Sequence, residues 1–173
     1  MSNPKINIKK TEVLSDNWYT FRKITYNYQK KSGELETHDR EAYDLGNGAT
    51  ILLYNKEQET VILTRQLRLP TYVNGNSTAM LIESCAGLLD LDNPEDCIKK
   101  ETEEETGYKI EEVQKVFEAY MSPGSVTEIL YFFVAQYDNR MKSSIRGGLP
   151  EEQENIEVLE LPFDKAYDTI STG

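Results

Sequence analysis

The chain of 173 residues has room for one ordinary domain, or for one domain with a small appendage. Hydrophobic residues make up 38% of it, enough for a core, but no run of about 18 apolar residues exists, which argues against a membrane-spanning helix. The 30 acidic and 19 basic residues give a net charge of −11, which argues against nucleic acid as a partner, because phosphate binding needs a basic stripe.

The first 43 residues predict an antiparallel β-sheet. Residues 18–28 alternate aromatic or β-branched side chains with polar ones, residues 31–34 have the composition of a hairpin turn, and residues 36–43 return as a partner strand. This segment has too few apolar residues for a two-sided core of its own. We therefore expect it to pack on the next domain or on another subunit.

From residue 46 onward the pattern changes to short apolar runs separated by turns. A helix is predicted over residues 94–106, because Asn93 can cap it, Pro94 suits its first turn and Gly107 suits its end. Polar loops are expected at residues 73–78 and 138–155, and a short helix from residue 163 to 170. Strands are predicted at residues 49–54, 61–67, 80–89, 114–121, 130–136 and 156–161. This order predicts an α/β sandwich with mixed sheets.

The last turns of the predicted helix carry the most informative pattern. Glu101, Glu103, Glu104 and Glu105 crowd a helix end that itself carries partial negative charge, and Glu101 and Glu105 repel as like charges at i,i+4. At about 100° per residue, Glu101, Glu104 and Glu105 project from one arc of the helix, while Glu103 points elsewhere. A bound dication would reverse both penalties, and Mg²⁺ prefers oxygen ligands. The alternative is a solvated acidic helix face.

Two other kinds of site are not supported. In a calcium loop of the EF-hand type, Asp90, Asp92 and Glu101 would fall at positions one, three and twelve, but a proline and a glutamate occupy positions five and six, where a ligand and a glycine are required. No serine or cysteine has a base partner visible in the sequence, which argues against covalent catalysis. His38, the only histidine, is expected to be a surface strand residue.

The compartment is predicted from the N-terminus and from the cysteines. Residues 1–10 are polar and of mixed charge and lack the apolar segment of a secretory signal. Cys85 and Cys97 lie in apolar or helical stretches without metal-ligand spacing, which favours reduced structural thiols over a disulfide. We therefore expect a cytoplasmic protein.

The segment around the predicted helix resembles the Nudix box, G-x5-E-x7-R-E-U-x-E-E-x-G-U, where U is aliphatic. Asn93 stands where the first glutamate belongs, the gap to the second half is one residue short, Lys100 replaces the arginine and Thr102 replaces an aliphatic residue. The resemblance implies a Nudix hydrolase with an α/β/α sandwich of mixed sheets and an additional N-terminal antiparallel β-sheet. It is carried by Gly87-Leu88-Leu89-Asp90 and by Lys100-Glu101-Thr102-Glu103-Glu104-Glu105-Thr106-Gly107-Tyr108.

Segments beyond the box resemble the bacterial GDP-mannose pyrophosphatases, a Nudix branch close to the ADP-ribose pyrophosphatases. Members of this branch are similar in being dimers whose N-terminal strands reach over the partner subunit. The resemblance thus implies a dimerisation region over residues 1–43, a Nudix hydrolase domain over residues 44–173, and a homodimer with exchanged N-terminal strands. The matching segments are residues 14–17, 46–50, 82–87 and 121–124.

Metal binding is the first role that the resemblance implies for named residues. Glu101, Glu105 and the backbone carbonyl of Ala86 would hold Mg²⁺, as two or three ions, with Mn²⁺ as a substitute. Glu104 would act in catalysis as an auxiliary ligand or as support for the cluster. A pyrophosphate and this chain are both anionic, so a bound cation would be needed to offset the repulsion between them.

The catalytic base is implied by residues 151–156, which resemble the E-x-E-D-I element of the branch. Glu152 matches its first glutamate and would be the metal-linked base, and Glu154 matches its second. From the residues alone, this stretch would be a solvated acidic loop.

Substrate contacts are also implied, several of them across the dimer. The residues alone leave plainer roles open, because Trp18 would suit a packed strand aromatic, Arg68 a surface arginine and Arg40 a cross-strand ion pair. The implied substrate-binding residues are Trp18, Asp39, Arg40, Glu41, Arg68, Ala86, Gly87, Leu88, Glu105, Glu128, Glu151 and Glu152.

The implied activity is Mg²⁺-dependent hydrolysis of GDP-mannose to GMP and mannose 1-phosphate. Two other functions stay open. One is hydrolysis of ADP-ribose or another nucleoside diphosphate sugar, and the other is ligand binding by a Nudix fold without turnover. A purely structural dimerisation protein would leave the glutamate cluster unexplained. The expected partners are therefore a nucleotide sugar and a second copy of the chain, with neither nucleic acid nor a membrane.

Overall fold

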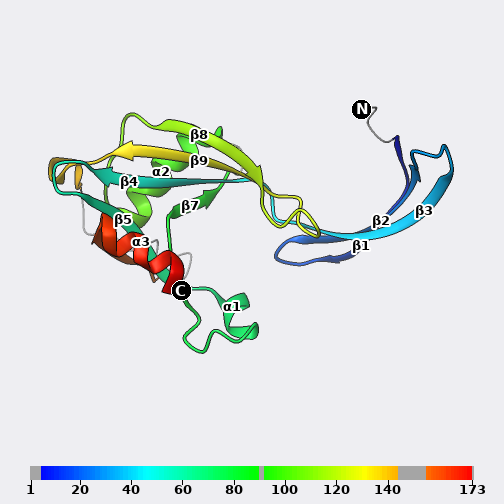
Figure 1. The fold of residues 1–173 in the computed structure, drawn as a ribbon, viewed down its shortest axis with the longest axis horizontal. Helices are drawn as coiled ribbons and strands as arrows, with labels where there is room; N and C mark the ends of the chain where they lie inside the picture. Colours follow the sequence, from blue (N-terminus) through cyan, green and yellow to red (C-terminus); the bar gives the residue numbers. More distant parts are fainter. Residues whose placement is uncertain (1–4, 90–91, 144–154, 173) are drawn as a thin grey trace. The chain divides into compact units, whose positions relative to one another are not determined.

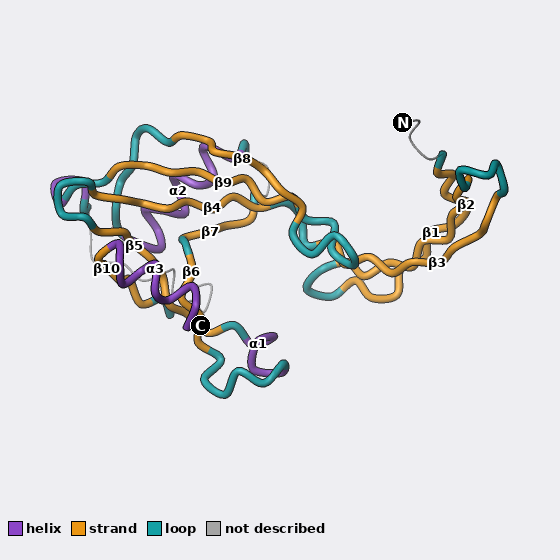
Figure 2. Tube along the Cα trace, in the orientation of Figure 1, coloured by secondary structure: helices purple, strands orange, loops and turns teal. Residues whose placement is uncertain are grey.

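The computed structural model describes residues 5–89, 92–143 and 155–172. These residues form two compact units (Figures 1 and 2). The first unit contains the chain up to Asn47 together with Ala119–Ile129, and the second contains Gly48–Glu118 and the chain from Leu130 onward. No helix in these described ranges is long and apolar enough to cross a membrane.

The first unit is built on a three-stranded antiparallel sheet. Its strands, β1 (Ile6–Asp16), β2 (Thr20–Gln29) and β3 (Leu35–Asp44), lie in the order β1-β2-β3. The predicted strands at residues 18–28 and 36–43 are confirmed as β2 and β3. Strand β1 was not evident as a strand of its own, because register shifts at Ile8/Lys10 and Val13/Ser15 interrupt the alternation of its side chains.

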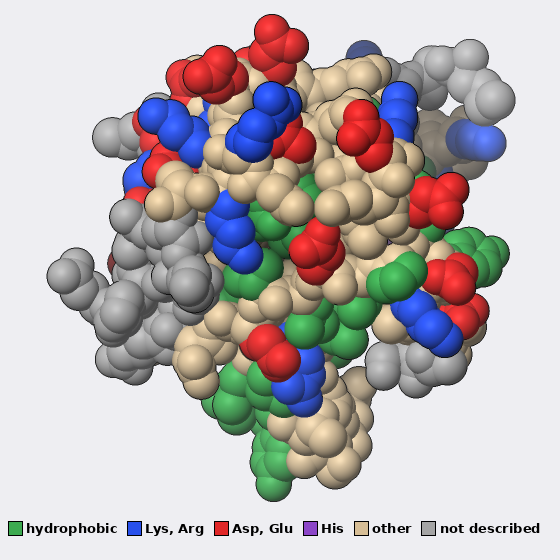
Figure 3. Space-filling view, turned by 90° about the vertical axis from the view of Figure 1, so that its left-hand side faces the viewer, with side chains coloured by type: hydrophobic (Ala, Val, Ile, Leu, Met, Phe, Trp, Pro, Cys, Tyr) green, Lys and Arg blue, Asp and Glu red, His purple; other side chains and the backbone are tan. Residues whose placement is uncertain are grey.

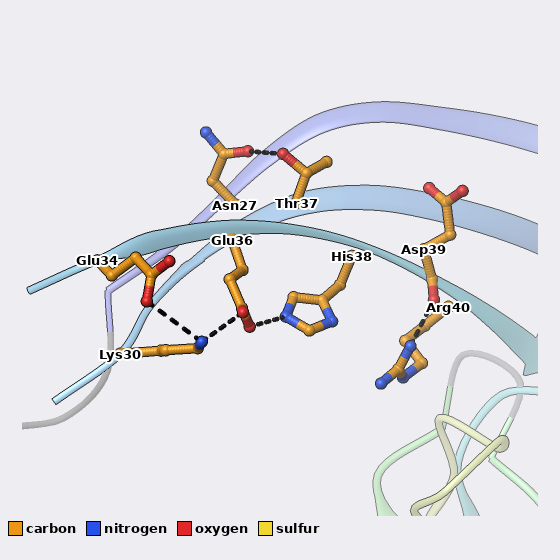
Figure 4. Close-up of polar contacts among 8 residues, drawn as sticks. All are labelled: Asn27, Lys30, Glu34, Glu36, Thr37, His38, Asp39 and Arg40. Atoms are coloured by element: carbon orange, nitrogen blue, oxygen red, sulfur yellow. Dashed lines mark hydrogen bonds and ion pairs between the residues drawn. The ribbon is translucent and has the colours of Figure 1, made fainter. Parts of the chain in front are cut away.

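The two faces of this sheet carry different side chains. Figure 4 shows Asn27 and Thr37 on one face, where the Thr37 hydroxyl donates to the Asn27 side chain at 3.1 Å, and Glu36 and His38 on the other. The His38 ring lies 5.7 Å from the ring of Tyr26 and stacks on it, and His38 Nε2 is 3.2 Å from a Glu36 oxygen. His38 is therefore half-buried in an aromatic and ionic cluster.

The second unit is built mainly on a seven-stranded mixed sheet. Its strands are β4 (Gly48–Asn55), β5 (Thr60–Leu67), β6 (Met80–Glu83), β7 (Cys85–Leu88), β8 (Gln114–Tyr120), β9 (Ile129–Gln136) and β10 (Glu157–Pro162). The main path runs β10-β5-β4-β9-β8, with β6 paired to β5 and β7 paired to β4. Strands β4 and β9 pair in parallel, and β4 is antiparallel to β5 and β7. The structure thus confirms a mixed α/β fold with an additional antiparallel sheet.

One predicted strand, residues 80–89, is divided in the structure. Its first half is β6, which pairs with β5, and its second half is β7, which pairs with β4. The chain changes partner at Ser84, which lies between the two strands. The prediction of one continuous strand is therefore wrong. Apolar composition alone does not reveal which neighbouring strand each half pairs with.

Three α-helices accompany the sheet. Helix α1 (Leu69–Val73) precedes the predicted polar loop, and α3 (Phe163–Thr172) packs on β10 and β5. The predicted central helix is confirmed as α2 (Pro94–Thr106), which packs on β7 and β4 (Figure 1). A short 3₁₀ helix, η1 (Asn139–Met141), follows β9.

The ends of α2 are fixed by local chemistry. The Asn93 side chain accepts hydrogen bonds from the backbone nitrogens of Glu95 at 3.1 Å and Asp96 at 3.0 Å. Gly107 takes a left-handed conformation with φ 78°, and its N–H donates to the carbonyl of Glu103 at 3.0 Å. A helix cap thus occupies the position where the Nudix box carries its first glutamate.

The buried core lies between α2 and the sheet. Its members are apolar apart from the tyrosine hydroxyls, and burial of their side chains provides the main driving force for folding of this unit. They are Ala49, Ile51, Leu53, Ile62, Cys85, Ile98, Tyr108, Ile110, Phe133, Ala135 and Tyr137.

Candidate functional site

The candidate site is organised by the contact between α2 and β7. Alternate residues of a strand point to the same face, so Cys85 and Gly87 both face the helix. Gly87 lies under Glu101, and Cys85 lies near enough to Glu105 for that carboxylate to raise the pKa of the Cys85 thiol. Two residues of a strand span about 6.7 Å and four residues of a helix about 6.0 Å. The strand pair and the helix pair are therefore matched in spacing.

Gly87 leaves the space that the Glu101 side chain occupies. A Cβ atom built on Gly87 would overlap with Cγ, Cδ and Oε1 of Glu101. Its φ lies outside the left-handed region, so the backbone does not need glycine for conformational reasons. An alanine at residue 87 would therefore force the Glu101 side chain to move from the position it occupies.

Glu105 carries its carboxylate into the protein interior. The residue is 2% exposed, and its Oε2 atom is buried. Burial raises the pKa of the Cys85 thiol well above its usual value, and the nearby Glu105 carboxylate raises it further. Burial of a carboxylate is costly unless hydrogen bonds, counter-charges or metal ions compensate.

The other two glutamates of α2 point to different partners. The Glu104 carboxylate is 3.8 Å from the ammonium group of Lys100. Glu103 accepts a hydrogen bond from the Ser143 hydroxyl at 3.3 Å, and so turns away from Glu101 and Glu105. Among the described residues, no group of three or more His, Cys, Asp or Glu side chains is arranged to hold a metal ion. Glu101 and Glu105 therefore need further oxygen donors, such as backbone carbonyls or substrate, to complete a metal site.

Arg68 is positioned by an acidic residue that was not among the predicted site residues. Arg68 Nε donates to a Glu83 oxygen at 2.7 Å, and the Arg68 side chain is 42% exposed. Glu83 ends β6, two residues before Cys85, where the strand that faces α2 begins. The only signal for Glu83 in the sequence is an acidic side chain within the apolar stretch of residues 80–89.

Ala86 and Leu88, also predicted to contact substrate, lie on β7 in the second unit, and the remaining predicted substrate residues that the structure describes lie in the first unit. Trp18 is 85% exposed and lines a hollow of about 450 Å³ together with Tyr19, Phe21 and Tyr43. Burial raises the pKa of Glu128 above its usual value. Aromatic rings around an open hollow can stack on a flat ligand.

Asp39 and Arg40 occupy neighbouring positions of β3. Hydrogen bonds from Thr25 and Lys23 hold the pKa of the Asp39 carboxyl below its usual value. Arg40 donates to the backbone carbonyl of Asp39 at 2.7 Å (Figure 4). Glu41 is exposed on the same strand. The predicted residues Glu151, Glu152 and Glu154 lie outside the described residues.

The visible charges do not form a polyanion-binding surface. On the face drawn in Figure 3, Lys and Arg side chains are interspersed with Asp and Glu, and the coloured residues show no continuous basic stripe. A phosphorylated ligand that approaches this face would meet individual basic side chains, since the coloured residues form no continuous positive patch there.

Two family models match consecutive parts of the chain. The N-terminal domain of the GDP-mannose pyrophosphatase NudK matches residues 5–43. The NUDIX domain matches residues 44–170. Together they cover nearly the whole sequence.

Curated relatives share more than half of their aligned residues with this chain. The GDP-mannose pyrophosphatase of Escherichia coli strain K12 is 56% identical over 169 residues, which are 98% of this chain and 87% of the relative. The GDP-mannose pyrophosphatase of Salmonella typhimurium strain LT2 is 56% identical over 168 residues, which are 97% of this chain and 87% of the relative.

A solved structure shares the fold at low sequence identity. The crystal structure of an ADP compounds hydrolase superposes with a TM-score of 0.72 and 18% sequence identity. The match covers 99% of this chain and 85% of that chain. It therefore extends over both units.

Proposed function

The chain belongs to the Nudix hydrolase family, and from this premise we propose that it hydrolyses the pyrophosphate bond of GDP-mannose, giving GMP and mannose 1-phosphate. The observation that carries the proposal is the glutamate pair on α2, with Glu101 seated on Gly87 and Glu105 buried against β7. The choice of substrate is supported by 56% identity to curated GDP-mannose pyrophosphatases over 98% of the chain.

Nudix hydrolases generally require a divalent cation, most often Mg²⁺. In this chain we assign Glu101, Glu105 and the carbonyl of Ala86 to hold it, as two or three ions, with Mn²⁺ as a substitute. These residues fit such a cation, because all three offer oxygen donors and Gly87 keeps open the space that Glu101 needs. When bound, the cation supplies charge neutralisation at the diphosphate and a lowered pKa for water.

The other residues would position the substrate and transfer protons. Glu152 accepts a proton from the water that attacks phosphorus, and Glu104 supports the carboxylate pair. Arg68 stabilises negative charge on the phosphate oxygens. Because Glu83 takes the Nε hydrogen of Arg68, the two terminal nitrogens of the guanidinium can meet a phosphate in a two-pronged contact.

Recognition of the nucleoside and sugar is assigned to the first unit. The hollow at Trp18 offers an aromatic surface for the base, and Asp39, Arg40, Glu41 and Glu128 offer polar groups. In the proposed homodimer, exchanged N-terminal strands bring these residues to the partner's catalytic domain. The proposal is supported by exposed apolar side chains on the N-terminal sheet, including Ile6 and Ile8 at 61% each.

A nucleotide-sugar panel tests the proposal. The purified chain is incubated with GDP-mannose, GDP-glucose, ADP-ribose and UDP-glucose, with MgCl₂ or with EDTA, and products are separated by ion-exchange chromatography. We expect the highest kcat/KM for GDP-mannose, equal amounts of GMP and mannose 1-phosphate, and no turnover in EDTA. A higher kcat/KM for ADP-ribose would reassign the substrate. Tight binding without turnover of any compound would instead indicate a binding protein.

A further inference from the structure

We propose that Thr127 and Asp44 are positioning residues, which fix the segment of residues 125–128 to the end of β3 and so place the Glu128 carboxylate for the nucleotide sugar. This inference rests on the proposed function, in which Glu128 offers a polar group to the substrate. It assigns a role to two side chains that the proposed reaction does not otherwise use. All of these residues lie in the first unit.

The first support is the backbone pairing between β3 and this segment. Tyr43, the last residue but one of β3, donates through its N–H to the carbonyl of Ser125 at 2.8 Å. Its carbonyl accepts a hydrogen bond from the N–H of Thr127 at 3.1 Å. Tyr43 and Val126 thus form a parallel bridge, although strands β4 to β8 lie between them along the chain. The segment therefore extends the pairing of β3, an edge strand of the three-stranded sheet.

The second support is a side-chain contact at the same place. The Thr127 hydroxyl donates to Asp44 Oδ1 at 3.1 Å and lies 3.5 Å from the carbonyl of Tyr43. A hydroxyl has one proton to donate, and the charged carboxylate is the closer and the stronger acceptor. The other carboxylate oxygen of Asp44 accepts a hydrogen bond from the Arg22 guanidinium on β2. Thr127 is therefore tied through Asp44 to the middle strand of the sheet.

The third support is the place of Glu128 in the segment. Glu128 directly follows Thr127, and its carbonyl accepts a hydrogen bond from the N–H of Met121 at 3.1 Å. The backbone of Glu128 is therefore held on both sides, by β3 through Thr127 and by Met121. Its side chain is half-buried. A carboxylate accepts hydroxyl hydrogens, such as those of a sugar.

Tyr43 links this segment to the aromatic hollow. Its ring lines the hollow together with Trp18 and lies 5.8 Å from the ring of Tyr19. Its backbone carries both hydrogen bonds to the segment. The surface assigned to the base and the carboxylate of Glu128 are thus fixed to the same residue. Two contacts that are arranged before binding hold a ligand more tightly, since less conformational freedom is lost on binding.

Steady-state kinetics with GDP-mannose at saturating Mg²⁺ test the role of the hydroxyl. Thr127→Val removes the donor at little change in size and should raise KM about fivefold, as for loss of one hydrogen bond. The kcat should change by less than about twofold, because the contact with Glu128 is made in the ground state as well as in the transition state. Thr127→Ser keeps the donor and should stay within about twofold of wild type in KM.

A double-mutant cycle shows whether Thr127 acts through Glu128. Glu128→Gln alone should raise KM, and adding Thr127→Val to it should raise KM by less than about twofold more. Hydrogen–deuterium exchange, followed by mass spectrometry, reports on the segment without substrate. Thr127→Val should exchange faster than wild type in peptides that contain residues 125–128, because their hold on β3 is weakened.

Thr37 provides a matched control. It is also an exposed threonine of the first unit, and its hydroxyl donates to the Asn27 side chain at the same distance of 3.1 Å. Thr37→Val should therefore leave KM, and exchange in peptides with residues 125–128, unchanged within about twofold. Should Thr127→Val fail to fold, Thr127→Ala takes its place, since it also removes the hydroxyl from an exposed position.

The outcomes separate this inference from the function on which it rests. Unchanged KM or unchanged exchange in Thr127→Val, an equal rise of KM in Thr37→Val, or a raised KM in Thr127→Ser would each overturn the role of Thr127 alone. Additive effects in the double mutant would show that Thr127 does not act through Glu128. If wild type does not hydrolyse GDP-mannose, the proposed function fails and the positioning role fails with it.

Discussion

At the scale of the residue, Glu105 combines a buried negative charge with the unfavourable end of a helix dipole. Glu105→Gln should lower turnover at least about 100-fold while leaving the fold intact, because a metal ligand is lost. In EDTA the melting temperature should stay equal or rise, since the substitution removes a buried charge. Glu103→Gln, whose side chain turns toward Ser143, is the matched control and should keep activity. Wild-type turnover of Glu105→Gln in Mg²⁺ would refute the metal assignment.

A substitution at Gly87 independently tests whether the position of the Glu101 side chain matters for activity. Gly87→Ala should displace the Glu101 carboxylate and lower kcat about 100-fold, the effect of a misplacement of about 1 Å at a reacting centre. The control is Gly124→Ala, because a Cβ at Gly124 meets nothing within 4 Å. Steady-state kinetics and thermal melts of both variants make the comparison. Full activity of Gly87→Ala would mean that Glu101 can move without consequence.

At the scale of the element, helix α2 depends on the cap at Asn93. Asn93→Ala removes the acceptor for two backbone N–H groups and should lower the free energy of unfolding by about 1 kcal/mol, whereas Asn93→Ser should retain most of it. Urea unfolding followed by circular dichroism measures the difference. Equal stability of the two variants would show that the cap contributes nothing to the stability of the helix.

The end of β3 should respond to pH through Asp44. The Arg22 guanidinium, the N–H of Gly46 and the Thr127 hydroxyl hold the pKa of this carboxyl below its usual value of 3.8. A lowered folded-state pKa stabilises the fold above the unfolded-state pKa, and this stabilisation is lost as the pH falls through the folded-state pKa. Asp44→Asn should therefore melt earlier than wild type at pH 7, and the gap should close as the pH falls below about 3.8. A gap that stays constant down to pH 3 would contradict the assignment.

The sequence predicted some secondary-structure elements more accurately than others. The bounds of α2 followed from Asn93, Pro94 and Gly107, because capping depends on side chains within one turn of the helix end. The division of residues 80–89 into two strands could not be predicted, since it depends on pairing with strands distant in sequence. Within the site, glutamate spacing predicted which carboxylates share a helix face, whereas the pairing of Glu83 with Arg68 and the burial of Glu105 required the tertiary structure.

At the scale of the whole molecule, we predict a homodimer that depends on the N-terminal sheet. Ile8→Glu places a charge on a side chain that is 61% exposed in the single chain and should shift light scattering from dimer to monomer. Turnover should fall with it, because the substrate residues of the first unit are assigned to the partner's site. Ile170→Glu, on α3 and 80% exposed, is the control for an added charge at an apolar surface position. A wild-type chain that scatters as a monomer and remains active at nanomolar concentration would refute the dimer.

The parallel pairing of β4 with β9 has a consequence for how the protein is made. Four strands and two helices, β5 to β8 with α1 and α2, lie between the two partners along the chain. Closing so long a loop costs entropy before the central pair forms, which slows folding. A nascent chain released only as far as β8 would still expose one edge of β4, its central strand. The hydrolase domain can therefore complete its core only after β9 has left the ribosome.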